Sequence, residues 1–543
     1  MSYRIAGGDF DTAGIATRKL KEQLAKIGVN AASMRRAMIA SYEAEMNVVI
    51  HARTGTLWAR VDSGKLDLEV ADEGPGIPNV ELALREGWST ASVQAREMGF
   101  GAGLGLPNIR RNSDLFEIET RVGRGTRVRS TILLNGAADG SAQVDASGPG
   151  PLAIESARCR RCLRCIFACP TGALRVHEKG PSALDALCIG CTACIGECPA
   201  GVYGIPEDAR SAEALRAVPE NAVCVVPAGF LSGFPVDHAP SRVRDALLLM
   251  GFSEVRLQEE WTVALRRETR IHAASGAGPF PLIPPVCPGV VALVESRYPS
   301  LIPHLCPWLS PIEAAGEEFP LRPVYLAAAC PAQHRAVARS SLTDRLTVLS
   351  ASFLAEAVRA RLPRAEERAL TRAAPAGEPA PVPGEIVVTG VRHVLRMLAA
   401  AEAGALGDAT VLDLSLCDTG CAGSPLLCSD PYLARHRLGE ISAIRPSVQG
   451  DAVAVPRART YAQRAGVRLD ADMGRAIGKL ARIDAMTHTL PGRDCGACGA
   501  PSCAAFAEDV VMCRAAADGC PHAAPAGKNP PGTSMGIRRE DMR

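Results

Sequence analysis

Alternating apolar and polar positions mark the first quarter of the chain as a mixed α/β domain. In KLDLEVA, from position 65, every second side chain is apolar, which predicts a half-buried strand. We place this domain at residues 1–136. The predicted elements are strands at 3–5, 56–61, 65–71, 116–120 and 126–133 and helices near 12–27 and 31–51.

Composition and cysteine spacing divide the rest of the chain. Small residues (AADGSAQVDASGPGP) predict a linker, and two dense groups of cysteines flank a long α/β stretch in which cysteines are far apart. We therefore expect a multidomain α/β protein. The predicted segments are a linker at 137–152, a cysteine-rich domain at 153–208, an α/β domain at 215–458, a second cysteine-rich domain at 475–525 and a polar tail at 526–543.

Charge, hydropathy and the N-terminus argue against several protein classes. Lys and Arg number 60 against 58 Asp and Glu, so we expect neither nucleic acid nor a membrane surface as a partner. No apolar run approaches the ~20 residues of a membrane-spanning helix. The start, MSYRIAGGDF, lacks the basic and apolar regions of a secretion signal. In a long cytoplasmic chain, 20 cysteines indicate metal ligands rather than disulfides.

A repeated cysteine pattern gives the strongest chemical signal. C-x2-C-x2-C-x3-C-P begins at Cys159 and recurs 29 residues later at Cys188. Three thiolates of each run converge on one cuboidal 4Fe-4S cluster, and the fourth reaches the other cluster. The pattern resembles bacterial two-cluster ferredoxins, which implies a ferredoxin fold that passes single electrons. Zinc or unrelated buried thiols are the alternative. The predicted ligand sets are Cys159, Cys162, Cys165 and Cys198 for one cluster and Cys169, Cys188, Cys191 and Cys194 for the other.

Three motifs in the first domain have the residue types of a nucleotide site. Glu43 and Asn47 lie about one helical turn apart, so their side chains project from the same face. Asp72 opens DEGPGI after a predicted strand, and the glycine-rich GFGAGLGL from position 99 leads into a helix. Glycines let backbone N–H groups approach phosphate, whose charge a helix N-terminus favours.

The order of these motifs resembles the GHKL (Bergerat-fold) ATPases, in particular the anti-sigma and stress-switch serine/threonine protein kinases. The segments DEGPGIPNVELALREGWST, EAEMNVVIHA and FEIETRVGRGT carry the resemblance. It implies an α/β sandwich in which Glu43 is the general base, Asn47 binds Mg2+ and Asp72 accepts a hydrogen bond from the adenine amino group. A Bergerat fold that no longer binds ATP is the alternative. The other nucleotide residues implied are Gly74, Gly76, Gly101, Gly103, Gly105 and Thr126.

Four separated cysteines of the long α/β stretch lie in a second set of motifs. PPVCPGVVALVESRYPSLIPHL, LAAACPAQ and LSLCDTGCAGS resemble the three signatures of the FeFe-hydrogenase large-subunit domain. The resemblance implies two lobes with a 4Fe-4S cluster between them, and it places Cys421 where true hydrogenases bridge to a diiron subsite. Structural cysteines without a cluster are the alternative. The implied ligands are Cys287, Cys330, Cys417 and Cys421.

The departures from that family concern the diiron subsite. Val286 replaces a cysteine that relays protons, and Gln333 replaces a lysine that hydrogen-bonds a cyanide on iron. Ala328 and Ser415 stand where two methionines pack around the subsite. We therefore expect the 4Fe-4S cluster without a diiron subsite, and no useful turnover of hydrogen.

The last cysteine group, DCGACGAPSC, is followed by Cys520 and Pro521. It resembles the small 4Fe-4S domain of redox-complex subunits, and a zinc knuckle is the alternative. Cys513 competes with Cys520 for the last position, and the proline after Cys520 favours Cys520. The implied ligands are Cys495, Cys498, Cys503 and Cys520. The remaining cysteines, expected to be buried thiols, are Cys224, Cys306, Cys428 and Cys513.

The fusion of a switch-kinase domain to electron-carrying domains predicts a redox sensor. The cofactors implied are four 4Fe-4S clusters, ATP and Mg2+. We expect a regulated or phosphorylated protein as one partner, and ferredoxin or hydrogenase subunits as others. Two further functions stay open: a divergent FeFe hydrogenase with a regulatory head, and an electron-transfer subunit of a larger oxidoreductase.

Overall fold

A computed structural model places most of the chain. The predicted tail, Gly101 and the predicted linker apart from residue 152 lie outside the residues that it describes. The described residues are 1–10, 12–91, 103–134, 152–205, 212–235, 240–276, 278–338, 346–365, 382–428, 430–444, 453–458, 460–464 and 468–523.

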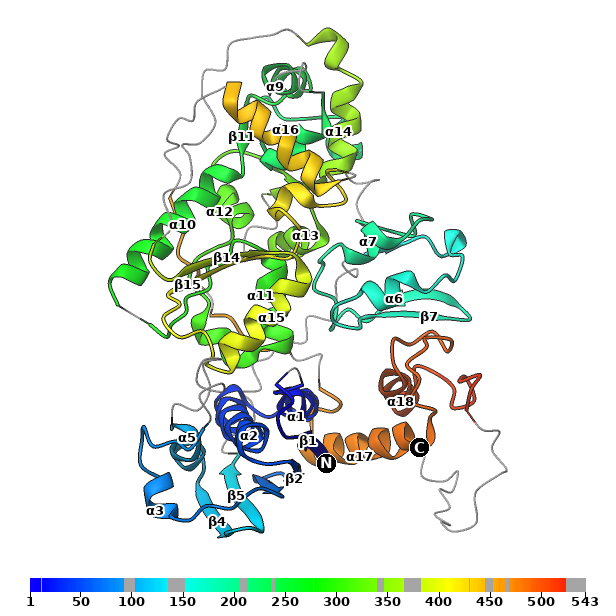
Figure 1. Cartoon of the computed structure of the whole chain (residues 1–543). Helices are drawn as coiled ribbons and strands as arrows, with labels where there is room; N and C mark the ends of the chain where they lie inside the picture. Colours follow the sequence, from blue (N-terminus) through cyan, green and yellow to red (C-terminus); the bar gives the residue numbers. More distant parts are fainter. Residues whose placement is uncertain are drawn as a thin grey trace.

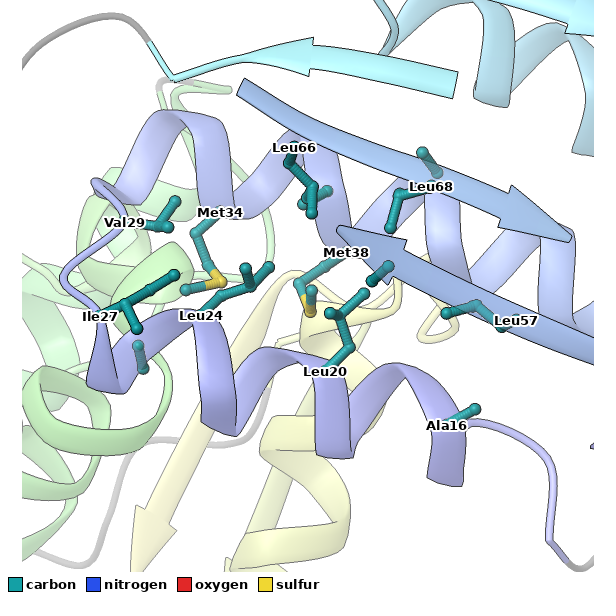
Figure 2. Packing of buried hydrophobic residues seen from close by; sticks show 14 of the residues in the cluster. Ala16, Leu20, Leu24, Ile27, Val29, Met34, Met38, Leu57, Leu66 and Leu68 are labelled. Carbon is teal, nitrogen blue, oxygen red and sulfur yellow. The ribbon is translucent and has the colours of Figure 1, made fainter. Parts of the chain in front are cut away.

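The N-terminal domain is an antiparallel sheet in the strand order β1-β2-β3-β5-β4, with helices packed on one face. Apolar side chains at alternate strand positions meet the apolar face of α1 and α2, as Figure 2 shows for Leu57, Leu66 and Leu20. Asn30 begins α2 by accepting a hydrogen bond from the backbone N–H of Ser33 (2.8 Å). The elements are β1 Ser2–Ala6, β2 Thr54–Val61, β3 Lys65–Asp72, β4 Leu115–Arg121, β5 Gly125–Leu133, α1 Ile15–Lys26, α2 Ala31–His51, α3 Val80–Ala83 and α5 Gly105–Arg111.

The second domain repeats a short helix within each cysteine run, which carries the third cysteine of that run. Two antiparallel strand pairs, β6 with β9 and β7 with β8, frame the helices. Its elements are β6 Ala153–Ile154, α6 Arg164–Ala168, β7 Leu174–His177, β8 Gly180–Ala183, α7 Ala193–Glu197 and β9 Tyr203–Gly204.

The long α/β stretch forms two parallel sheets, β11-β10-β12-β13 and β14-β15. Helices flank both sheets (Figure 1). The strands are β10 Val223–Val226, β11 Glu254–Leu257, β12 Val324–Ala328, β13 Leu346–Ser350, β14 Glu385–Thr389 and β15 Val411–Ser415. The helices are α9 Pro240–Leu248, α10 Glu259–Ala274, α11 Pro288–Arg297, α12 Pro311–Glu317, α13 Pro331–Ala338, α14 Ala351–Arg359, α15 Val391–Glu402 and α16 Pro431–Ile444, with short 3-10 helices at η2 Ala228–Gly233, η3 Pro299–His304 and η5 Gly420–Gly423.

The C-terminal helices α17 (Met473–Thr489) and α18 (Cys503–Val511) lie beside the N-terminal domain rather than apart from it (Figure 1). Leu480 and Phe506 belong to the same hydrophobic cluster as Leu20 of α1. None of the described helices is long and apolar enough to cross a bilayer. The predicted multidomain α/β fold class is confirmed, whereas the joint core of the first and last domains was not predicted.

Candidate nucleotide and cluster sites

A cavity of about 680 Å³ lies against α2, the end of β3 and the loop before α5. It brings together most of the predicted nucleotide residues that the structure describes. Gly74 lies just outside its lining and donates its backbone N–H to Asp72. The predicted residues that line the cavity are Glu43, Asn47, Asp72, Gly76, Gly103, Gly105 and Thr126.

The carboxylate of Asp72 is held from one side only. Its Oδ1 accepts hydrogen bonds from the backbone N–H groups of Gly74 (2.7 Å) and Thr126 (3.2 Å). Burial raises the pKa of Asp72, and the two amide hydrogen bonds oppose that rise. Within the described part of the chain no donor contacts Oδ2, which leaves this oxygen able to accept a hydrogen bond from a ligand.

Glu43 and Asn47 face the cavity from α2, and α5 packs across them. Asn108 donates its side-chain N–H to Glu43 Oε1 (2.6 Å). A Cβ at position 105 would lie 3.0 Å from Asn47 Oδ1, so glycine permits the close approach of α5. Asn108 was not predicted as a site residue, although its place one turn after Gly105 was a usable signal.

The loop after Asp72 is fixed by backbone and hydroxyl contacts. Gly76 has a φ of 72°, and a Cβ there would overlap the carbonyl of Arg121. The backbone N–H of Ile77 donates to Thr120 Oγ1 (2.8 Å), which lies 3.0 Å from Thr126 Oγ1. The loop therefore holds one wall of the cavity against β4 and β5.

The eight cysteines of the second domain surround two small cavities. Backbone N–H groups of Ala173 and Val202 point at the sulfurs of Cys169 (3.2 Å) and Cys198 (3.4 Å). Such N–H donors stabilise the charge of cluster sulfurs and thiolates. The first cavity is lined by Cys159, Cys162, Cys165 and Cys198, and the second by Cys169, Cys188, Cys191 and Cys194.

The four cysteines of the third domain come from the ends of separate elements. Cys287 is the N-cap of α11, Cys330 follows β12, and Cys417 follows β15. Burial, together with the charge of the neighbouring Cys287, raises the pKa of the Cys330 thiol to about 12. Cys421 responds to the charges of the other three thiols, so the four side chains lie close together. We call this set the cage.

Two close contacts between this chain's own residues lie beside the cage. Gln333 is buried and accepts a hydrogen bond from the backbone N–H of Ala329 (2.7 Å). Its Nε2 lies 3.9 Å from the sulfur of Cys421. A Cβ at Gly229 would lie 2.7 Å from Ala422 Cα, so η2 and η5 are in close contact beside the cage.

The last cysteine group forms a loop before α18. The charges of Cys520 and Cys495 act on the Cys498 thiol, which places these three side chains near one another. Cys503 begins α18, and its backbone N–H donates to Asp494 Oδ1 (2.7 Å). Cys513 is exposed, so the expectation that it is a buried thiol was wrong.

The cysteine sites are joined through direct contacts between domains. Thr192 Oγ1 lies 3.9 Å from the sulfur of Cys417, which places the second cavity beside the cage. On the opposite side, the N–H of Val176 donates to the carbonyl of Gly499 (2.8 Å), and Asp509 forms a buried ion pair with Arg175. Among the described residues, no three His, Cys, Asp or Glu side chains converge closely enough for a single metal ion.

Four family models match separate parts of the chain. The histidine kinase-, DNA gyrase B- and HSP90-like ATPase model matches residues 35–136, and the 4Fe-4S dicluster domain matches residues 152–199. The iron only hydrogenase large subunit, C-terminal domain, matches residues 223–319, and a Fe-S cluster family matches residues 490–522.

Curated relatives match the N-terminal domain. The serine/threonine-protein kinase RsbT of Bacillus subtilis (strain 168) is 30% identical over 121 residues, which cover 21% of this chain and 85% of that protein. The anti-sigma F factor of Caldanaerobacter subterraneus subsp. tengcongensis is 35% identical over 94 residues, or 16% of this chain. The chain spans 62% of the length of that factor.

Among solved structures, a variant of the FeFe-hydrogenase HydA1 from Chlamydomonas reinhardtii is 16% identical to this chain, with a TM-score of 0.36. The match covers 50% of this chain and 93% of that one. A similarity at this level is no argument about activity. By its N-terminal domain the chain belongs to the family of the serine/threonine-protein kinase RsbT, and it joins that domain to a two-cluster 4Fe-4S domain, an iron-only hydrogenase-like domain and a C-terminal Fe-S domain.

Proposed function

We propose that the chain is a redox sensor in which iron–sulfur clusters regulate an ATP-dependent serine/threonine kinase. One observation carries the proposal. Helix α11 begins at the cage cysteine Cys287 and ends at Arg297, which contacts two other domains. Its guanidinium donates to Glu22 of α1 (2.9 Å) and to the carbonyl of Pro170 (2.6 Å), the residue after Cys169.

The N-terminal domain receives this contact on α1, which packs against the helix that carries its candidate active residues. Glu45 of α2 is buried and accepts hydrogen bonds from the backbone N–H groups of Ala16 (3.1 Å) and Thr17 (2.9 Å) at the start of α1. Glu45 stands between Glu43 and Asn47 on α2. A shift of α11 would therefore reach these two residues in two steps. Arg297 contacts Glu22 of α1, and the start of α1 contacts Glu45 of α2.

The predicted residues suit the chemistry of both cofactors. Asn47 would hold Mg2+ on the nucleotide, and Asp72 would bind the adenine amino group through its open oxygen. The γ-phosphoryl group would pass from ATP to a serine or threonine hydroxyl of a partner, leaving ADP, while Glu43 takes the hydroxyl proton. A 4Fe-4S cluster supplies one-electron oxidation and reduction. The cysteine sets predicted from sequence would hold four such clusters.

The proposal is tested with the full chain purified without oxygen. We expect about sixteen irons per chain, four for each cluster, and ATPase and kinase rates that differ between oxidised and dithionite-reduced protein. Equal rates in the two states would reject the coupling. Infrared bands from iron-bound carbon monoxide and cyanide, with hydrogen turnover, would instead identify a hydrogenase, an interpretation that the contacts of Gln333 and Gly229 beside the cage do not favour.

A further inference from the structure

The cavity that holds Glu43, Asn47 and Asp72 is not closed by the N-terminal domain alone. Its other wall belongs to the hydrogenase-like domain, from Phe280, from η3 and from the end of α15 with the turn that follows. We call these residues the second wall. Their members are Phe280, Ser300, Leu301, His304 and residues 401–405.

The second wall stands at one end of α2. At the other end, His51 lies near Asp72. Burial lowers the pKa of His51, and the charge of the nearby Asp72 carboxylate opposes that shift. Arg35 is close to His304 of the second wall. Burial lowers the pKa of His304, and the charge of Arg35 also lowers it. Glu43 lies eight positions from each of Arg35 and His51, or about 12 Å along a helix. The order along α2 is therefore adenine end, Asn47, Glu43 and second wall.

A buried polar cluster fixes the second wall against the N-terminal domain. The Glu402 carboxylate accepts hydrogen bonds from Lys21 of α1 and from Ser300 of η3. The Lys21 ammonium also lies 4.1 Å from the ring centroid of Tyr298. Lys21 and Glu402 are both largely shielded from water, so this contact holds the two domains in one arrangement.

We propose that the nucleotide site is shared between two domains, and that the second wall contacts the triphosphate end of a Mg2+-bound nucleoside triphosphate. The proposal rests on the nucleotide-binding part of the proposed function and goes beyond it. A ligand that touches both domains favours their docked arrangement, and the docked arrangement in turn favours the ligand. Nucleotide binding and the position of the cluster-bearing domain are then linked without any further element.

The test measures binding of Mg2+ and AMP-PNP, a nonhydrolysable ATP analogue, to the full cluster-containing chain. Ala405 is an exposed residue of the second wall, and Ala399 is exposed on α15 outside the cavity lining. We expect Ala405→Trp to weaken AMP-PNP binding about tenfold or more because the indole occupies ligand space, whereas Ala399→Trp leaves it unchanged. Equal binding by wild type and Ala405→Trp would overturn the shared site.

A second measurement does not depend on substitution. Hydrogen exchange of the wild-type chain, followed by mass spectrometry, should show protection of residues 299–304 and 401–406 when Mg2+ and AMP-PNP are added. Protection confined to residues 43–134 would overturn the shared site while leaving nucleotide binding intact. If the wild-type chain binds no AMP-PNP at all, both the shared site and the proposed kinase function fall.

Discussion

The two-cluster module and the cage hold their cysteines in opposite ways. In the module the cysteines are neighbours in sequence, and two equivalent turn-and-helix repeats place them around their cavities, with Cys162 exposed. In the cage, Cys287, Cys330 and Cys417 come from the ends of one helix and two strands in different parts of the domain. Burial raises the pKa of each of these three thiols.

This difference separates a local site from an assembled one. A site built from one short segment keeps its geometry when neighbouring domains move. A site built from the ends of several packed elements keeps its geometry only while those elements stay in place, because packed interiors transmit small displacements. This difference agrees with the proposed division of roles, in which the module carries electrons and the cage and the nucleotide cavity regulate the kinase.

The largest difference between the two sites is expected when one cysteine is removed from the cage and, in a separate variant, one from the module. Cys330→Ser should abolish the cage cluster, lower iron by about four atoms per chain and remove the redox dependence of the kinase rate. Cys162→Ser should disturb one module cluster and leave the cage signal in place. Iron analysis and electron paramagnetic resonance of both variants measure this. Loss of the cage signal in Cys162→Ser would contradict the local character of the module.

Removing the buried ion pair between the module and α18 should measure how much a contact between domains contributes to the stability of the chain. Asp509→Ala leaves the buried Arg175 guanidinium without its carboxylate, and we expect destabilisation towards the top of the ~3–5 kcal/mol range for such changes. Thermal unfolding of the full chain measures it. The exposed Asp518 provides the control, because Asp518→Ala should change stability by less than about 0.5 kcal/mol.

Removing the Lys21–Glu402 contact should also lower the stability of the chain, and its effect on AMP-PNP binding provides a second measurement. Lys21→Ala leaves the Glu402 carboxylate shielded and without its cation, which we expect to cost about 3–4 kcal/mol of the free energy of unfolding. It should also weaken AMP-PNP binding, measured by calorimetry, because the second wall loses its anchor. Lys19 is exposed on the same helix, and Lys19→Ala should change neither quantity.

The smallest effect is expected inside the nucleotide cavity. Gly105→Ala places a Cβ 3.0 Å from Asn47 Oδ1, so the side chain of Asn47 must move by a few tenths of an ångström. We expect about 1 kcal/mol of lost ATP affinity, roughly fivefold. Titration with Mg2+ and ATP measures this. Unchanged affinity would mean that Asn47 does not set the position of the ligand.

Local patterns were enough to predict the strands and the long helices of the N-terminal domain, but not the short α3. Helix α2 covers the predicted residues 31–51, and β3 begins at Lys65 and runs one residue beyond the predicted strand, because strict alternation leaves one register that buries the apolar side. The spacing of Glu43 and Asn47 likewise required only a helix. Strand bounds shifted by one or two residues, and α1 begins at Ile15 rather than near residue 12.

Family resemblance supplied most of the cysteine sets, and the structure brings most of their members together. It could not supply Asn108 or Gln333 in their observed roles, because each depends on a partner from another element. The exposure of Cys513 was not predicted for a similar reason. No periodicity distinguishes a cysteine that faces solvent from one that faces its neighbours.

The sequence by itself determined which segments fold together as strands, helices and cysteine runs, because those choices depend on residues close along the chain. Only the tertiary structure decided how these segments meet. It placed α17 and α18 in one core with α1, and it brought Glu402 to Lys21 across 381 positions. Such contacts depend on the shapes of whole domain surfaces, and no local pattern of apolar and polar residues encodes them.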